Sequence, residues 1–519
     1  MLRFVIPPSL SLAHCRAMLT SLTRRHEALR TTYHLDGGPH QRVHAPGPWP
    51  IRQASVERDG TPSPAEVIEE LTGTPFDLES EWPIRACIIT RNGAPVQAAV
   101  VFNHLAVDMW TLERIEQELW AQAQGVMARR PAALPPVRHQ PADLAAWEQS
   151  ADAAVLAAGA LAHWQDRVSG LPADLFAARR SAEGGRPLHA TLTSPPLLDA
   201  ARQVAARHKV WPSAVHMAAH AALLSAYTGQ GAVGQLAFSG NRGSHPYQDV
   251  LTCMFSPMLM RVDCSDDPPF GELVRRVAAE SESASRHAYV PYDEVVELVS
   301  REGRRRGTAV RLGSEVNFLN QRTLEYRGSR TTFTWNKPPE AWAGYGNDTY
   351  LRIDEWRDTV VLGLQAAGSV MDAAAVEAFL RGHEALILAH AGSSGDLRVS
   401  EAAELAGIQA PPTVPSPVPP AVPPAGPLPA ADEAAVRALA EAVRRVHGLA
   451  AIDPSDDYVS AGGRVLRAPE VLARLRDDGW AGLTPRALAE PTPLAVLAGL
   501  LAPARSPDAD LPTHQKLGV

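Results

Sequence analysis

The chain has 519 residues, of which 45% are hydrophobic and 20% are charged, and its formal net charge is −8. This composition is that of a globular protein with room for about three domain-sized cores, and the negative charge argues against a nucleic-acid partner. The four cysteines form no Cys-x-x-Cys pair, which indicates reduced thiols. No apolar run approaches the ~20 residues of a membrane-spanning helix. The first residues lack the long apolar core of a signal peptide. We expect a cytoplasmic protein without a membrane partner, and we assign no metal site.

Helical and strand-like segments alternate through the first 400 residues or so. Apolar spacing and alanine content predict helices at residues 11–23, 111–124, 155–168, 211–227, 271–287 and 373–389. A first strand is expected at the very start, and others at 98–102, 250–262, 316–319 and 359–365, with one more following 28–33 and a turn at 36–38. Such mixing predicts an α/β fold in two subdomains, which we place at residues 1–175 and 176–400.

A proline-rich stretch marks the clearest boundary. Residues 411–429 are mostly Pro, Ala and Val, and we assign 409–430 as a linker in an extended polyproline conformation of roughly 60 Å. Beyond it, helices expected at 431–447 and 466–477, and a segment at 483–501 interrupted by prolines, predict a small helical bundle over 431–502. The tail 503–519 is predicted to be disordered.

One short segment carries candidate chemistry. Residues 101–110 (VFNHLAVDMW) predict a buried strand that runs into a turn, with His104 and Asp108 four residues apart. Histidine is suited to proton transfer near neutral pH, and an aspartate at this distance can hold the turn or fix the ring. A histidine held in a turn for structural reasons is the alternative, because a chain of this composition contains about one such pair by chance.

Several separated segments resemble, in the right order, the condensation domains of nonribosomal peptide synthetases. They are 25–31 (RHEALRT), 103–109 in place of HHxxxDG, 143–147 with His163-Trp164, 240–242 with 251–261, and 290–293 (VPYD). Together they span about residues 3–392. The resemblance implies two chloramphenicol-acetyltransferase-like subdomains that form a V, with the active site in a tunnel between them. It also implies attack of an amine, or in some members a hydroxyl, on an acyl thioester carried by a phosphopantetheine arm.

The same resemblance implies roles for individual residues. The catalytic second histidine of the signature matches His104, and the structural aspartate and arginine that pair in this family match Asp108 and Arg242. Asn103 stands where the first histidine of the signature belongs, and an amide can still form hydrogen bonds there. Met109 replaces the glycine, so its side chain would narrow the acceptor side of the tunnel. Departures in the later strand signature are Thr252, Ser256 and Pro257.

The C-terminal bundle resembles a peptidyl carrier domain. Residues 456–466 match its DxFxxLGGxSL pattern, but Val465 takes the place of the serine that carries phosphopantetheine, and Ser460 lies five residues too early. The resemblance therefore implies a carrier-like domain without a covalently bound cofactor. Phosphopantetheine would be presented by partner acyl or peptidyl carrier proteins.

These observations lead to three hypotheses about function. The first is a condensation enzyme acting in trans in a peptide or hybrid natural-product pathway. The second is a non-catalytic condensation-like scaffold that recruits a partner to the assembly line; Asn103 and Met109 favour it and His104 opposes it. The third is a coenzyme-A-dependent acyltransferase of the plant HxxxD type, whose DFGWG segment is missing. The sequence leaves open the donor, the acceptor, amide or ester product, and the oligomeric state.

Overall fold

The computed structural model describes all residues except 35–39, 57–62, 182–183, 244, 322–324, 327, 329, 340–346, 393–395, 410, 412–431, 490–491 and 504–519. The chain forms two compact units. Unit 1 comprises Met1–Val155 and Ser239–Ser256, and unit 2 comprises Leu156–Phe238 and Pro257–Val519. The predicted boundary at residues 175/176 thus differs from the observed one at 155/156, and a later segment returns to unit 1. The turn predicted at 36–38, the linker except for 409 and 411, and nearly all of the tail lie outside the described residues.

Unit 1 is built on a four-stranded sheet in the order β1-β6-β5-β4, in which β1, β5 and β6 are antiparallel neighbours and β4 runs parallel to β5. A separate pair, β2 and β3, forms a hairpin. The strands are β1 (Leu2–Val5), β2 (Thr31–His34), β3 (His40–Val43), β4 (Ile51–Val56), β5 (Ile84–Arg91) and β6 (Ala94–Phe102). The helices are α1 (Leu12–Arg25), α2 (Pro64–Thr72), α3 (Met109–Met127) and α4 (Pro141–Glu148), with a 3-10 turn at Glu27–Arg30.

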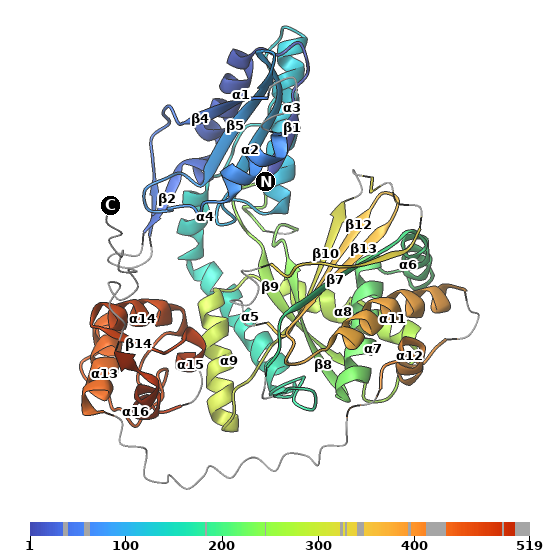
Figure 1. Cartoon of the computed structure of the whole chain (residues 1–519), viewed down its shortest axis with the longest axis vertical. Helices are drawn as coiled ribbons and strands as arrows, with labels where there is room; N and C mark the ends of the chain where they lie inside the picture. The colour runs from blue at the N-terminus through green and yellow to red at the C-terminus, as the bar shows by residue number, and fades with distance from the viewer. Residues whose placement is uncertain are drawn as a thin grey trace, which may run out of the picture. The chain divides into compact units, whose positions relative to one another are not determined.

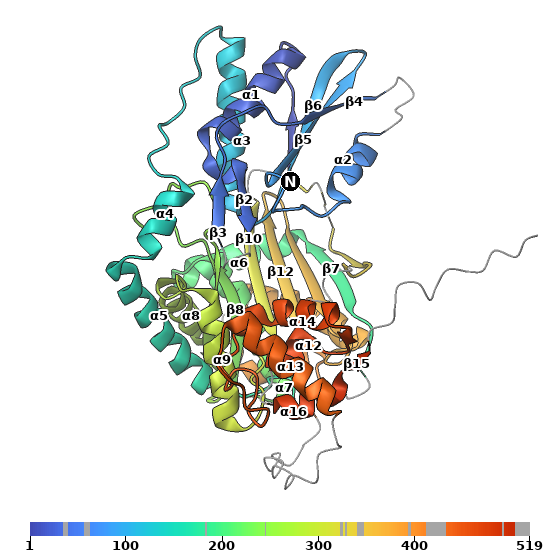
Figure 2. The ribbon, with the colours of Figure 1, turned by 90° about the vertical axis from the view of Figure 1, so that its left-hand side faces the viewer.

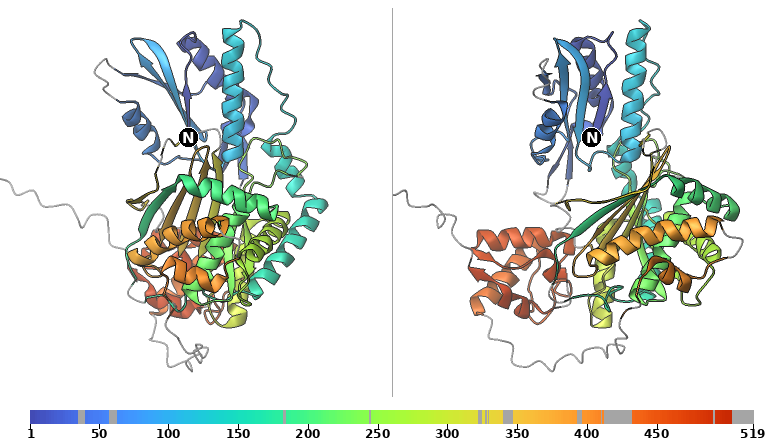
Figure 3. Two further views of the ribbon diagram at one scale, coloured as in Figure 1. Left: turned by 90° about the vertical axis from the view of Figure 1, so that its right-hand side faces the viewer. Right: turned by 45° about the vertical axis from the view of Figure 1, so that its right-hand side comes forward.

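Both faces of this sheet are covered, which explains why the end of β6 is apolar without alternation. Ala98, Val100 and Phe102 pack against α1 and α3, whereas Ala99 and Val101 pack against α2. Figures 2 and 3 show α2 on one side of the strands and α1 and α3 on the other. The buried strand therefore delivers residue 103 to a fixed point at the edge of the unit.

Unit 2 contains a seven-stranded sheet in the order β11-β7-β13-β12-β10-β8-β9 (Figure 1). Its strands are β7 (Leu188–Ser194), β8 (Ala232–Ser239), β9 (Ser256–Asp263), β10 (Ser314–Gln321), β11 (Thr332–Trp335), β12 (Thr349–Trp356) and β13 (Val360–Ala366). The helices are α5 (Ala151–Ser169), α6 (Pro195–His208), α7 (Pro212–Thr228), α8 (Phe270–Arg286), α9 (Tyr292–Arg306), α11 (Ala373–Gly392) and α12 (Val399–Ala406). Alternation in β9 divides the helices: Met258 and Met260 join the core made by α6, α7, α8, α11 and α12, and Leu259 joins that of α5 and α9.

The C-terminal residues fold into a small bundle with its own core, which includes Leu439, Tyr458, Val471 and Leu494. Its elements are α13 (Glu433–His447), a 3-10 turn (Val465–Arg467), α14 (Ala468–Asp477), β14 (Trp480–Ala481), α15 (Pro485–Ala489), α16 (Leu494–Leu497), a second 3-10 turn (Ala498–Leu500) and β15 (Ala502–Pro503). The helical bundle expected over 431–502 is thus confirmed for its described residues. Among these residues and the rest of the described chain, no helix is both long and apolar enough to cross a membrane.

The helices expected from apolar spacing are all present, with ends that shift by a few residues. The strand expected over 250–262 is wrong in its first half, because β9 begins only at Ser256. Several backbone groups of residues 250–254 instead bond to side chains. The carbonyls of Val250 and Thr252 accept hydrogen bonds from Arg242, and the amide of Met254 donates one to Asp108. A pattern of apolar residues cannot reveal such competition from distant side chains.

Candidate functional site

The turn after β6 holds the predicted catalytic residue. The backbone amide of Asn103 donates to the carbonyl of Pro83 at 3.0 Å, and its side-chain Oδ1 accepts from the amide of Leu105 at 3.0 Å. The carbonyl of Asn103 also accepts from the amide of Ala106 at 3.1 Å. An asparagine therefore closes this turn through its own backbone and side chain, a common use of the residue. His104 stands on the closed turn and is exposed within unit 1.

The imidazole of His104 is held by two residues that are distant in sequence. The Sγ atom of Cys253 lies 3.6 Å from Nδ1 of His104, and the ring of Phe255 lies 5.0 Å from the imidazole, centroid to centroid. Burial, with a smaller contribution from the charge of Asp108, raises the pKa of the Cys253 thiol to about 11. The thiol thus stays protonated near neutral pH. If Nδ1–H donates to sulfur, the lone pair of Nε2 is left to accept a proton, whereas the opposite tautomer makes Nε2 a donor.

Asp108 locks the other end of the turn. Its Oδ1 accepts from the amide of Thr111 at 2.8 Å, which caps the N-terminus of α3. Its Oδ2 accepts from NH2 of Arg242 at 2.9 Å and from the amide of Met254 at 3.0 Å. The side chain of Asp108 is 5% exposed and that of Arg242 is 9% exposed. The predicted buried ion pair is therefore present, and both carboxylate oxygens of Asp108 accept hydrogen bonds.

Arg242 connects three chain segments. NH1 donates to the carbonyls of Gln248 and Val250 at 3.0 and 2.8 Å, and NH2 donates to Thr111 Oγ1 at 3.2 Å and to the Thr252 carbonyl at 2.9 Å, besides Asp108. Thr111 Oγ1 in turn donates to the Thr252 carbonyl at 2.7 Å. These bonds place Cys253 beside the turn that carries His104. Sequence reasoning missed Cys253 because it is 149 residues from His104, and its place in the matched segment 251–261 gave no sign that it contacts the histidine.

Met109 begins α3, directly after the N-cap, and the residue is 43% exposed. Its backbone position follows from the Asp108 cap, so a different side chain could occupy this site without changing the turn. The acceptor-side role assigned to Met109 stays a prediction, as do the V arrangement and the tunnel.

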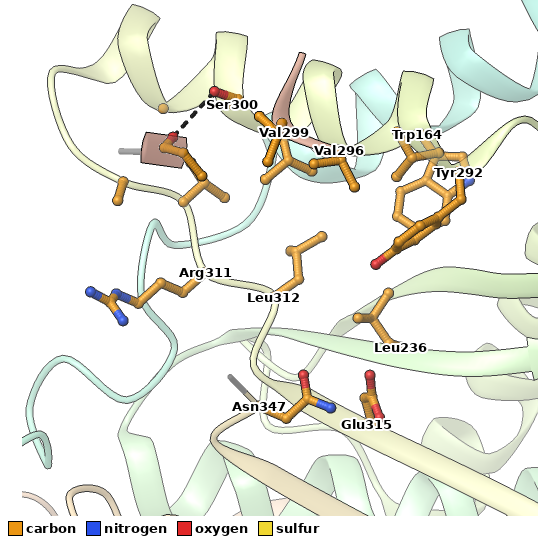
Figure 4. Close-up of a pocket in the computed structure, with 16 residues that line it drawn as sticks. Trp164, Leu236, Tyr292, Val296, Val299, Ser300, Arg311, Leu312, Glu315 and Asn347 are labelled. Carbon is orange, nitrogen blue, oxygen red and sulfur yellow. Dashed lines mark hydrogen bonds between the residues drawn. The ribbon is translucent and has the colours of Figure 1, made fainter. Parts of the chain in front are cut away.

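An apolar cavity lies elsewhere, within unit 2. It has a volume of about 250 Å³ and is lined by Tyr292, Val296 and Val299 of α9 and by Leu236 and Leu312, with Glu315 and Asn347 at one side (Figure 4). Burial raises the pKa of the Glu315 carboxyl. None of His104, Asp108 and Arg242 lines this cavity.

Two residues of the C-terminal bundle, Val465 and Ala489, line the same cavity. The carbonyl of Ala489 accepts a hydrogen bond from Ser300 Oγ at 3.4 Å, the dashed line in Figure 4. Arg304 of α9 donates to Asp457 Oδ1 at 3.1 Å. Val465 thus lines an apolar cavity together with residues of α9. Among the described residues, no group of three or more His, Cys, Asp or Glu side chains is arranged to hold a metal ion.

Comparison with known proteins identifies the fold and family. The family model described as Condensation domain matches residues 4–339. A probable non-canonical nonribosomal peptide synthetase, CymA of Salinispora arenicola, is 28% identical over 309 residues, which cover 56% of this chain and 4% of that protein. The chain therefore corresponds to a small part of this relative's length.

Solved structures share the fold. The X-domain from teicoplanin biosynthesis superimposes with a TM-score of 0.59 at 20% identity, covering 77% of this chain and 90% of the X-domain. The same domain has been solved in complex with OxyB. A condensation domain for chain release from the enacyloxin polyketide synthase gives a TM-score of 0.56 at 21% identity and covers 80% of each chain. The predicted α/β fold is confirmed.

Proposed function

Because this chain belongs to the condensation-domain family, we propose that it forms an amide, or an ester, by attack of an amine or hydroxyl acceptor on a carrier-bound acyl thioester in nonribosomal peptide biosynthesis. The observation that supports the proposal is the placement of His104. Its ring is exposed, its Nδ1 faces Cys253 at 3.6 Å, and its turn is fixed by the buried pair of Asp108 and Arg242. A ring held in this way can orient one acceptor against one acyl carbon.

The step needs alignment and one proton acceptor. The acceptor nitrogen attacks the thioester carbonyl while Nε2 of His104 takes its proton; the C–N bond forms, the C–S bond breaks, and the proton passes to the leaving pantetheine thiolate. Alignment of two reactants can lower the barrier by several kcal/mol, and a positioned base contributes typically ~10²–10⁴-fold. The Nδ1–H to Sγ tautomer is the one that leaves Nε2 free for this task.

The choice of donor tests the proposal. Purified protein would receive the same acyl group on a carrier protein, on coenzyme A, or no donor, together with a panel of amine and alcohol acceptors. We expect product with the carrier-bound donor, and product analysis distinguishes amide from ester. Turnover with acyl-coenzyme A alone would support the coenzyme-A-dependent alternative instead.

A non-catalytic scaffold is the second candidate. It is supported by Asn103 and Met109, which depart from the family signature, and by the likeness to the teicoplanin X-domain, which has been solved with OxyB. In this case the chain would recruit a partner enzyme to the assembly line, and the donor assay would give no product with any donor.

Met109 offers a prediction about the acceptor. Glycine at this first helical position would remove the side chain of an exposed residue next to the capped turn. We expect Met109→Gly to widen acceptor tolerance or to raise the rate with carrier-bound acceptors. A glycine in the first turn costs helix stability of roughly 1 kcal/mol or less, so Met109→Ala serves as the control for side-chain removal without this cost. Unchanged rate and selectivity in both variants would exclude a gating role.

We propose that the C-terminal bundle is a carrier-like domain that has lost its attachment site and acts as a docking or stabilising element. The loop before Val465 requires glycine at two neighbouring positions. Gly462 has a φ of 96°, which other residues rarely adopt, and a Cβ atom at Gly463 would lie 2.4 Å from the ring of Tyr458. Tyr458 holds the loop by donating to the carbonyl of Arg464 at 2.8 Å. The position of Val465 supports a stabilising role for the bundle, because this residue lines the apolar cavity beside α9.

The missing hydroxyl gives a direct prediction. Modification requires an oxygen that attacks the pyrophosphate of coenzyme A, and Val465 offers only methyl groups. We expect no mass increase when the full chain is incubated with coenzyme A and a promiscuous phosphopantetheinyl transferase, as measured by intact-mass spectrometry. An active carrier protein in the same tube is the control for the transferase. A phosphopantetheine adduct within residues 453–470 would overturn our interpretation of this domain.

A further inference from the structure

A second, polar cavity lies in unit 1 next to the first turn of α3. It has a volume of about 360 Å³, and its wall includes Trp110, Arg114, Arg138, His139, Arg242 and Asp249. The wall thus carries three guanidinium groups in a chain whose net charge is −8. The single carboxylate on the wall, Asp249, lies 3.2 Å from Nδ1 of His139 and is engaged there.

Two of the arginines have no carboxylate partner within the part of the chain that the structure describes. Arg114 donates to the amide oxygen of Gln117 at 3.2 Å, and Arg138 makes no ion pair there. The guanidinium of Arg242 lies 4.0 Å from the ring centroid of Trp110, and that of Arg114 lies 5.4 Å from it. One indole therefore holds two cations at the same cavity. Their charge is available to an anion.

Arg242 adds an independent observation. Four of its five N–H groups belong to NH1 and NH2, which bond to Asp108 and to neighbouring oxygens, but its Nε atom is buried and has no hydrogen-bond partner among the described residues. The side chain is 9% exposed. Arg242 lines the cavity, and a buried donor without a partner costs roughly 1–3 kcal/mol, so its guanidinium keeps one N–H for which the described chain supplies no acceptor.

We propose that this cavity binds a phosphate group of the thioester substrate. Guanidinium groups match the oxygens of phosphate in charge and in planar geometry, and paired arginines bind phosphate more tightly than a single surface cation does. The site rests on the proposed function, because that function brings a phosphopantetheine thioester to unit 1. Arg242 also joins Asp108, so the cavity and the turn of His104 share one structural residue. Phosphopantetheine and coenzyme A both carry this chemistry.

Binding, rather than turnover, tests the site. The full chain would be titrated calorimetrically with 4′-phosphopantetheine, pantetheine, coenzyme A and inorganic phosphate. The cavity variant is Arg114→Gln/Arg138→Gln. The control, Arg24→Gln/Arg91→Gln, makes the same change in charge at two exposed positions of unit 1 away from the cavity. We expect the cavity variant to weaken phosphopantetheine binding about tenfold or more, and the control to stay within about twofold.

Comparison of the three pantetheine-containing ligands shows which phosphate the cavity binds. Pantetheine, which lacks phosphate, is expected to bind the wild type as weakly as phosphopantetheine binds the cavity variant. Equal affinities for phosphopantetheine and coenzyme A would assign the phosphate next to pantetheine, whereas tighter coenzyme A binding that is lost in the variant would assign the nucleotide phosphate. Equal binding of pantetheine and phosphopantetheine, or an unaffected cavity variant, would overturn the site. The titration measures affinity and does not require turnover. If the cavity binds phosphopantetheine as expected but the donor assay gives no condensation product, the proposed enzymatic function is rejected and the phosphate site is retained.

Discussion

His104→Ala is expected to reduce product formation by about 10²-fold or more while the fold stays intact. The reason is local: the turn is closed by Asn103 and fixed by Asp108, so alanine removes the imidazole and leaves the backbone bonds in place. The measurement is initial rate with a carrier-bound donor, supported by a thermal unfolding curve to confirm the fold.

Leu105→Ala is the matched control for this change. Leu105 lies on the same turn, is 52% exposed, and contributes only its backbone amide to the bond with Asn103, which alanine retains. We expect its rate to stay near that of the wild type. If His104→Ala also works within a few-fold of the wild type, the imidazole carries no chemistry and the catalytic role proposed for His104 is rejected.

Asp108→Ala is expected to lower both stability and activity. It leaves the guanidinium of Arg242 buried without its carboxylate and removes the N-cap of α3, and breaking a buried pair from one side costs roughly 3–5 kcal/mol. Denaturant unfolding, with the melting temperature as a second measure, quantifies the loss. Activity should fall as well, because Met254 and the neighbouring Cys253 lose the bond that fixes them near His104.

An exposed ion pair in the same unit supplies the control. Arg52 and Glu70 are 2.8 Å apart with side chains 52% and 65% exposed, and Glu70→Ala should cost at most about 1 kcal/mol. The double variant Asp108→Ala/Arg242→Ala should recover part of the stability lost by Asp108→Ala, since no unpaired charge is then buried. A loss from Asp108→Ala no greater than that from Glu70→Ala would show that the pair is not structural.

The sequence by itself was sufficient for the family, the α/β class and the positions of the helices with regular apolar spacing. Helices such as α3 and α8 depend on contacts between residues three and four apart, which a local pattern records. The absence of a hydroxyl at Val465 is likewise fixed by sequence alone. His104, Asp108 and Arg242 were found through the order of the motifs, not through local periodicity.

The tertiary structure decided what depends on residues far apart in the chain. It brought Cys253 to His104 across 149 positions, and it replaced half of a predicted strand by hydrogen bonds between the backbone of residues 250–254 and the side chains of Asp108 and Arg242. It also placed Arg114 and Arg138 at one cavity and Val465 at another. These juxtapositions arise from packing and from the pairing of buried polar groups, and neither leaves a periodic trace in the sequence.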